Sequence, residues 1–278
     1  MPDVPRAELR SLLRRYRRIV HERYHDSMRV LHWQTPARVW AIDFAEPSEC
    51  CEPSLPPIDG RYPYLVAVRD LGGYQLAWLP VMAATAEETV RVLASLFARY
   101  GPPLVLKLDN GPPFVAAETG AFLDAAGVLP LFSPPHWPSY NGAIEAGIGS
   151  LKTRTERQAF KASRLGCWTW DDVEAARQEA NTTARPHGER GPTPAEAWTN
   201  RTSVTALERT RFQLTVDRHR FMVRTQERIG WDTELDHWQG SALDRKALQH
   251  ALVEHGYLLF TRRRLPLRIK PRKVTTIS

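Results

Sequence analysis

The chain has 278 residues and a net charge of +7, and 42% of its residues are hydrophobic, a composition typical of globular proteins rather than disordered or fibrous ones. No segment reaches the roughly 20 apolar residues of a membrane-spanning helix. The basic start has no apolar run behind it, which excludes a secretory signal. Three cysteines, two of them adjacent, cannot form a disulfide framework. We therefore expect a reduced, cytoplasmic protein with no membrane partner.

The charge is divided unevenly along the chain. Residues 1–36 carry a net charge of +4, residues 37–200 carry −5 and residues 201–278 carry +8. This pattern predicts a basic helical arm, a core and a basic C-terminal region. Basic segments suit a polyanion such as nucleic acid, whereas an acidic core fits if some of its carboxylates hold divalent metal ions. The alternative is that charge simply varies along the chain.

Hydrophobic spacing predicts the elements in chain order. A helix is expected over residues 6–31, followed by a strand over 37–45. Turn residues separate two further strands, 64–69 and 74–81, as in a hairpin. The later elements are a helix beginning after a capping box at Thr85, a strand at 103–108, a helix at 114–126, a strand at 128–132, a proline-rich loop at 133–140 and helices at 142–163 and 171–185.

The Pro/Gly-rich segment 185–198 closes this unit. Beyond it we expect a helix at 243–254 and a strand at 256–260. The order of strands and helices is that of an α/β, RNase H-like fold. We expect a mixed five-stranded sheet flanked by helices, and a smaller basic C-terminal region.

Three carboxylates occupy unusual places in this pattern. Asp43 lies inside an apolar strand, where an acid is costly unless a cation satisfies it. Asp109 follows a buried strand directly, and Glu145 begins a helix after the proline loop. The two aspartates converge if their strands are neighbours, and Glu145 joins them if its helix crosses the strand ends. Three hard oxygen ligands around an open site suit Mg²⁺.

With these residues, the chain resembles the catalytic core of DDE-type transposases and retroviral-type integrases, particularly bacterial insertion-sequence transposases. The resemblance covers roughly residues 36–198 and rests on the segments VWAIDF, YLVAVRDLGGYQLAWLPV, LKLDNGPPF, SPPHWPSYNGAIE and RPHGERGPTPAEAW. It implies that Asp43, Asp109 and Glu145 are the metal ligands of an enzyme that cleaves DNA strands and transfers them to a target.

The resemblance also implies the partners. Two Mg²⁺ or Mn²⁺ ions would activate the attacking group and stabilise the leaving oxygen. DNA, as element ends and target, is the expected substrate, and joining two ends implies a homo-oligomer that is nucleoid-associated when bound to DNA. Only 42 residues precede Asp43, fewer than the usual upstream helix-turn-helix domains need, so a separate polypeptide is a candidate for end recognition.

The spacing of the acids is weak support without its context. Asp109 and Glu145 are separated by 35 residues, and so are Asp172 and Glu208. Asp172 lies at a helix start and is more simply a helix cap. Two alternatives to an active transposase therefore stay open: an inactive or truncated DNA-binding remnant, and a simple RNase H-fold nuclease.

Several basic residues are expected to contact DNA phosphates. Lys152 lies seven residues after Glu145 on the same helical face, where the family often has a DNA-contacting lysine; a solvated surface lysine is the alternative. The C-terminal tail adds seven cations, which supply sequence-independent affinity: Arg262, Arg263, Arg264, Arg268, Lys270, Arg272 and Lys273.

Polar residues beside the carboxylates have weaker assignments. Asn110 and Asn141 match family motifs and are expected to shape the turns next to the metal ligands. His136 matches a histidine of the proline loop, with a DNA contact and loop packing both open. Asp70 is expected to stabilise the turn after its strand rather than act as a fourth carboxylate.

Two features depart from the family pattern. Gly147 and Gly149 interrupt the helix that begins near Glu145, where better helix formers are usual. They would permit close approach to DNA, or mark a decaying copy. His21 and His25 with the Cys50–Cys51 pair resemble a zinc module, but adjacent cysteines suit a tetrahedral site poorly and we do not expect structural zinc.

Overall fold

The computed structural model describes residues 11–16, 27–47, 50–52, 62–135, 138–186, 188–230 and 232–264. Its elements in chain order are β1(Ser27–Trp33), β2(Val39–Ala45), β3(Cys50–Glu52), β4(Tyr64–Asp70), β5(Gln75–Val81), α2(Ala86–Tyr100), β6(Val105–Leu108), α3(Pro112–Val115), α4(Ala117–Ala125), β7(Leu129–Phe132), η2(Pro138–Asn141), α5(Gly142–Lys161), β8(Cys167–Thr169), α6(Trp170–Thr183), α7(Pro194–Thr199), α8(Ala206–Gln226), α9(His237–Glu254) and β9(Leu258–Arg264). No described helix is long and apolar enough to cross a membrane.

The contacts divide the chain into two compact units. One contains residues 33–257, and the other contains residues 1–32 with 258–278. The second unit holds a two-stranded sheet of β1 and β9, in which His32 Nε2 lies 2.7 Å from Thr261 Oγ1. The division at residues 36 and 200, drawn from charge, stays a prediction.

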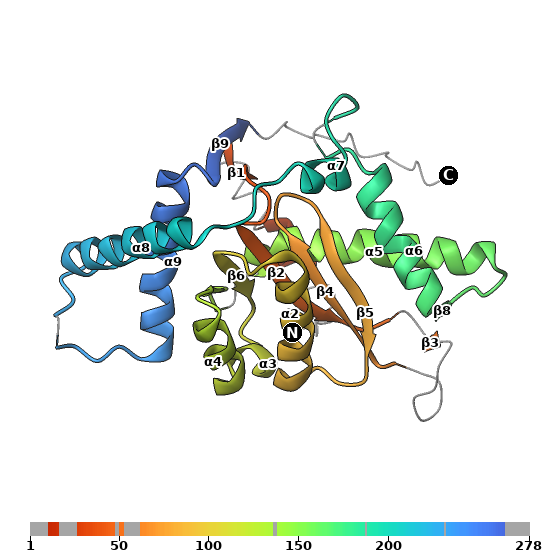
Figure 1. Cartoon of the computed structure of the whole chain (residues 1–278), viewed down its shortest axis with the longest axis horizontal. Coiled ribbons are helices and arrows are strands. Elements are labelled where there is room, and N and C mark those ends of the chain that lie inside the picture. Colours follow the sequence, from red (N-terminus) through yellow and green to blue (C-terminus); the bar gives the residue numbers. More distant parts are fainter. Residues whose placement is uncertain are drawn as a thin grey trace, which may run out of the picture. The chain divides into compact units, whose positions relative to one another are not determined.

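A five-stranded mixed sheet forms the centre of the larger unit, in the order β5-β4-β2-β6-β7. β2 pairs with β4 and β4 pairs with β5 in antiparallel fashion, whereas β2, β6 and β7 run parallel. Helices cover both faces, with α2 on one side of the strands and α5 on the other (Figure 1). The predicted fold class is therefore confirmed.

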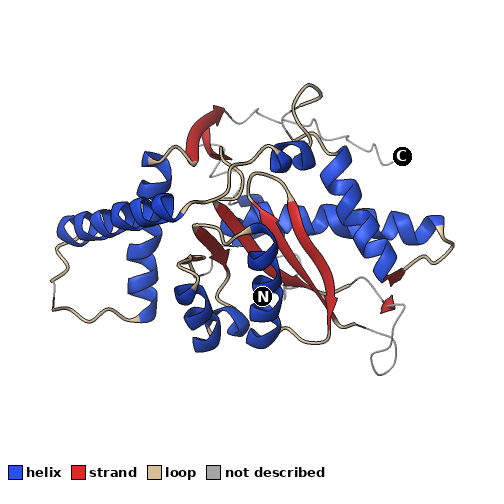
Figure 2. Ribbon diagram, viewed as in Figure 1, coloured by secondary structure: helices blue, strands red, loops and turns tan. Residues whose placement is uncertain are grey.

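The core lies between the sheet and α2. Trp40 is fully buried on β2 and packs against Phe97 of α2 and Trp198 of α7, with ring centroids 5.7 and 6.3 Å apart. On the opposite face, Trp78 of β5 donates its indole N–H to the Thr155 hydroxyl of α5 at 3.1 Å. Aromatic packing on one face and a satisfied polar contact on the other fix the sheet between two helical layers (Figure 2).

The sequence prediction needs correction at both ends of the chain. Residues 11–16 are helical, but residues 27–31 of the predicted helix belong to strand β1. The reason is long-range pairing with β9, which overrides local spacing. The helix α8 was not predicted, although Phe212, Val216 and Val223 are buried at helical spacing. The helix α9 begins at His237, six residues before the predicted start.

Candidate active site

Asp43 and Asp109 are brought together by two parallel neighbouring strands. Ala41 on β2 pairs with Lys107 on β6. Asp43 follows Ala41 by two residues, and Asp109 follows Lys107 by two residues. Asp43 is half-buried within β2, and its Oδ1 accepts the Phe44 amide at 2.8 Å. Asp109 lies just past the end of β6, with its Oδ1 accepting the Gly111 amide at 2.7 Å. The convergence expected from the sequence therefore follows from the observed sheet order.

Glu145 lies in the first turn of α5 and is exposed. Its helix packs across the sheet face that contains Asp43, contacting both β2 and β4. The carboxylates of Asp109 and Glu145 both raise the pKa of Asp43, and burial is the largest cause of that rise, which brings the pKa to about 6. Three acids from three separate elements therefore interact through their charges near the carboxyl ends of β2 and β6.

A polar bridge joins the two turns that carry Asp109 and Glu145. Asn110 donates from Nδ2 to the Ser133 carbonyl at 2.8 Å, and the Ser133 hydroxyl lies 2.7 Å from Asn141 Oδ1. The assignment of Asn110 and Asn141 to the turns thus has a physical basis, because both are tied to the same serine. Ser133 was missed by the sequence analysis; its only signal was its place at the start of the proline-rich loop.

Lys107 is a second residue that the sequence analysis missed. It is 7% exposed, and its ammonium group donates to the Tyr140 carbonyl and lies near the Tyr140 ring, 4.2 Å from the ring centroid. Burial lowers its pKa to about 8, while the charge of Glu145 opposes that shift. A lysine inside the apolar segment VLKL was the available signal.

The expected DNA contacts are only partly described. Lys152 is half-exposed on α5, two turns beyond Glu145, so both residues occupy one helical face. Arg262 is exposed on β9. Arg263 and Arg264 belong to the same strand, and their side chains lie outside the described part. The structure also does not describe the other residues to which functions or alternatives were assigned: Arg268, Lys270, Arg272, Lys273, His136, His21 and His25.

The second acid pair with the same spacing is structural. Asp172 forms a capping box with Thr169 at the start of α6 and an ion pair with Arg164 at 2.6 Å. Glu208 lies in the first turn of α8 and pairs with Arg38 at 2.8 Å. These interactions do not join Asp172 to Glu208. Asp172 therefore takes part in capping α6, as the third residue of a capping box whose N-cap is Thr169 rather than as the cap itself.

Asp70 acts over a longer range than predicted. Its Oδ1 accepts the Ala37 amide at 2.8 Å, which ties the end of β4 to the segment that enters β2. The backbone of the same residue also closes the turn, because the Gly73 amide donates to the Asp70 carbonyl at 2.8 Å. The residue is 1% exposed, which suits a structural link and not a ligand at an open site.

The donor chemistry of Asp43, Asp109 and Glu145 fits a hard divalent cation, since all three offer carboxylate oxygens and their mutual repulsion would be relieved by positive charge. Within the described residues, however, no three His, Cys, Asp or Glu side chains form a ready-made metal site. Asp43, Asp109 and Glu145 therefore supply the oxygen donors of a magnesium site, but their side chains are not gathered closely enough to form a ready-made one.

Comparison with curated proteins finds retroviral polyproteins. The chain is 29% identical over 157 residues to the Pol polyprotein of Radiation murine leukemia virus (strain Kaplan), which covers 55% of this chain and 25% of that protein. It is 29% identical over 126 residues to the Gag-Pro-Pol polyprotein of Simian retrovirus SRV-2, covering 44% and 6%. The chain thus spans a quarter or less of these relatives. No family model matches it.

Comparison with solved structures also finds retroviral proteins. A chain of the simian T-cell lymphotropic virus intasome in complex with PP2A regulatory subunit B56 gamma matches with 18% identity and a TM-score of 0.50, covering 60% of this chain and 57% of that one. The HTLV-2 integrase catalytic core domain in complex with magnesium, in its dimeric form, matches with 18% identity and a TM-score of 0.46, covering 60% and 99%. The core has a retroviral-type integrase fold; an insertion-sequence origin stays a prediction.

Proposed function

We propose that this chain is a DDE transposase or integrase that catalyses metal-dependent cleavage of DNA strands and their transfer to target DNA. The observation that carries the proposal is the electrostatic grouping of Asp43, Asp109 and Glu145 near the carboxyl ends of two neighbouring strands in an integrase-type sheet. The likeness to retroviral Pol polyproteins over 157 residues supports the same function.

The proposed cofactor is Mg²⁺ or Mn²⁺, with two ions held by Asp43, Asp109 and Glu145. When bound, the ions would activate the attacking oxygen and stabilise the leaving one. The solved HTLV-2 integrase core contains magnesium, which supports this choice. The protein's own part is to hold three carboxylates from β2, the turn after β6 and α5 on a rigid frame. No covalent enzyme intermediate is needed, because the acids act as ligands.

DNA binding is assigned to basic residues outside the carboxylate group. Lys152 would meet a phosphate near the cleaved bond, and its position on the same helical face as Glu145 supports this assignment. The tail from Arg262 to Lys273 would add sequence-independent affinity. We further propose a homo-oligomer on DNA and a separate polypeptide for end recognition, in a cytoplasmic, DNA-associated protein.

The test is strand cleavage of a labelled duplex in Mg²⁺ by single-site variants. Asp109→Asn should lower cleavage by at least about 1,000-fold, because a neutral amide is a poor replacement for a charged metal ligand. Asp43→Asn and Glu145→Gln should behave alike. All three should keep their affinity for DNA, which depends on the basic residues.

The matched control is Asp124→Asn, the same change at an exposed residue of α4. It should cleave and join DNA at the unaltered rate. Equal activity of Asp109→Asn and Asp124→Asn would refute the assignment of the site. Hydrolysis without any joined product would instead identify a simple nuclease.

A further inference from the structure

A half-buried arginine contacts the helix that carries Glu145. Arg69 lies near the end of β4, beside an irregularity in its pairing with β5 between Val68 and Arg69. Its Nη1 donates to the carbonyl of Ala143 at 2.8 Å. Ala143 lies in the first turn of α5, two residues before Glu145.

The missing side chain of Gly147 makes room for this arginine. Gly147 is buried on α5, one turn after Ala143. A Cβ built at Gly147 would lie 2.9 Å from Arg69 Nη1 and 3.2 Å from its Cδ. Both distances are too short for an ordinary contact, so an alanine here would displace the arginine, the helix or both. Gly149 differs, since nothing lies within 4 Å of a Cβ at that position.

The sheet register places Arg69 on the same face as Asp43. Ala41 of β2 is paired with Arg69, and Asp43 is paired with Ala67. Directly paired residues share a face, and residues two apart on one strand share it too. Arg69 and Asp43 therefore both face α5. The contact with Ala143 fixes the distance between this face and the turn of α5 that carries Glu145.

We propose that Arg69 is a positioning residue, whose guanidinium, seated in the space left by Gly147, holds the first turn of α5 so that Glu145 faces Asp43 and Asp109. This inference rests on the proposed function, because it assigns Glu145 to the metal site. The proposal also explains why α5 contains one of its two unfavourable interior glycines. Packing against Arg69 requires a glycine at position 147, whereas nothing requires one at Gly149.

The experiment compares Gly147→Ala with Gly149→Ala. Both changes raise helix propensity equally, so they differ only in what the new methyl group meets. Gly147→Ala should lower Mg²⁺-dependent cleavage about 10- to 100-fold, because displacing a reacting group by about 1 Å has effects of this size. It should also weaken Mn²⁺ binding several-fold in a titration followed by water-proton relaxation. Gly149→Ala should leave both measurements unchanged.

A double-mutant cycle tests whether the arginine carries the effect. Arg69→Gln is too short to reach Ala143 and should resemble Gly147→Ala in both measurements. The double variant Gly147→Ala with Arg69→Gln should be no worse than either single variant, because all remove the same contact. Arg69→Gln combined with Gly149→Ala should match Arg69→Gln alone. Additive losses from Gly147→Ala and Arg69→Gln would overturn the proposal.

Two results separate this inference from simpler explanations. A purely structural role would lower the urea midpoint of unfolding in EDTA while the folded protein kept its Mn²⁺ affinity; that outcome would overturn the proposal. If Gly147→Ala does not fold, Arg69→Gln alone provides the Mn²⁺ comparison. If the unaltered protein cleaves no duplex, the proposed function fails, whereas equal Mn²⁺ binding by Gly147→Ala and Gly149→Ala refutes the inference alone.

Discussion

At Asp70, burial and hydrogen bonding act in opposite directions on one carboxyl group. Burial raises the pKa of Asp70 to about 7, against the amides of Ala37 and Gly72 and the charges of Arg69 and Arg201, which lower it. The group is 1% exposed, so loss of hydration outweighs these favourable contacts. Asp70, which the sequence assigned to a turn rather than to the metal ligands, is therefore better described as a buried link between β4 and the segment that enters β2.

This pKa predicts how stability depends on pH. The folded state binds a proton more tightly than the unfolded state, whose Asp pKa is near 4, so the unfolding free energy should fall as pH rises from about 4 to about 7. Asp70→Asn keeps an acceptor for Ala37 but cannot ionise. It should remove a pH-dependent contribution on the order of a few kcal/mol.

Urea unfolding at several pH values measures this difference. Asp43 contributes with the same sign, since its pKa is also raised, and its contribution remains in Asp70→Asn. The comparison of Asp70→Asn with the unaltered protein therefore isolates Asp70. Parallel curves for the two proteins between pH 4 and 7 would contradict the prediction.

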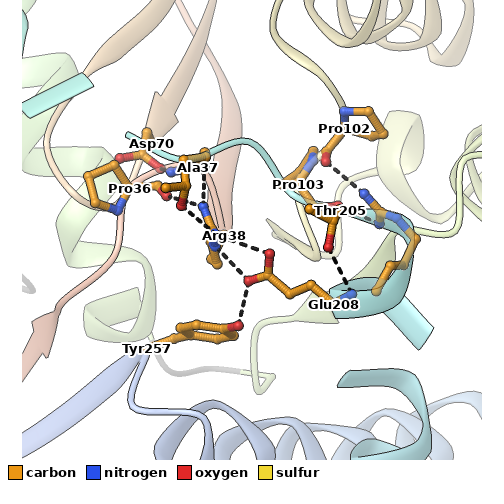
Figure 3. A network of polar contacts seen from close by, with 11 residues as sticks. Pro36, Ala37, Arg38, Asp70, Pro102, Pro103, Thr205, Glu208 and Tyr257 are labelled. Carbon is orange, nitrogen blue, oxygen red and sulfur yellow. Dashed lines mark hydrogen bonds and ion pairs between the residues drawn. The ribbon is translucent and has the colours of Figure 1, made fainter. Parts of the chain in front are cut away.

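The helix α8 is attached to the sheet by charged groups rather than by a large apolar surface. Arg38, at the start of β2, donates to both carboxylate oxygens of Glu208 at 2.8 and 3.0 Å, and the Tyr257 hydroxyl donates to Glu208 at 2.5 Å (Figure 3). Arg209 adds bonds to the carbonyls of Pro102 and Pro103 at 2.8 Å each. The first turn of α8 thus binds both the start of β2 and the segment before β6.

Removing Glu208 should therefore be costly. Arg38 is 5% exposed, so Glu208→Ala leaves a buried cation without its carboxylate and should lower the free energy of unfolding by about 3 to 5 kcal/mol. Glu254→Ala is the control, because its ion pair with Arg218 is exposed and should contribute little. Chemical denaturation compares the two variants; equal midpoints would show that the buried pair contributes no more than the surface one.

Local patterns predicted the core elements well, and the error at β1 has a long-range cause. The strands β2, β4 and β5 carry apolar runs bounded by turn residues, and Thr85 caps α2 as its sequence indicates, accepting the Glu88 amide at 3.2 Å. The strand β1 was mistaken for helix because its partner β9 lies at the other end of the chain. Pairing across that distance leaves no local signal.

In the candidate site, too, some residues had a local sequence signal and others did not. Each of the three acids had a local signal: Asp43 interrupts an apolar strand, Asp109 follows one directly, and Glu145 begins a helix after the proline loop. The supporting residues Arg69 and Lys107 could not be recognised from the sequence. Their roles depend on hydrogen bonds to the carbonyls of Ala143 and Tyr140, which are distant along the chain. Gly147 was seen as an anomaly in the sequence, but its reason is a side chain from a strand more than seventy residues earlier.

At the scale of the whole molecule, the basic tail predicts how DNA affinity responds to salt. The strand β9 ends at Arg264, so a chain stopped there keeps its pairing with β1 and lacks Arg268, Lys270, Arg272 and Lys273. Each phosphate that the shortened chain no longer neutralises should reduce the slope of log affinity against log salt by about 0.9. Binding to all sequences should weaken together, as measured by fluorescence anisotropy at several salt concentrations. An unchanged slope would exclude the tail as an anchor.

The pairing of β1 with β9 has a consequence for the order of folding. Joining these strands closes nearly the whole chain into a loop, which is entropically unfavourable in an unfolded polypeptide. The larger unit removes most of that penalty beforehand, because the Gln34 amide bonds the Tyr257 carbonyl at 3.0 Å and so holds the two points from which the strands continue. A two-stranded sheet is marginal on its own. The two-stranded sheet of β1 and β9 should therefore form last and open first, as a reversible local event while the rest of the chain stays folded.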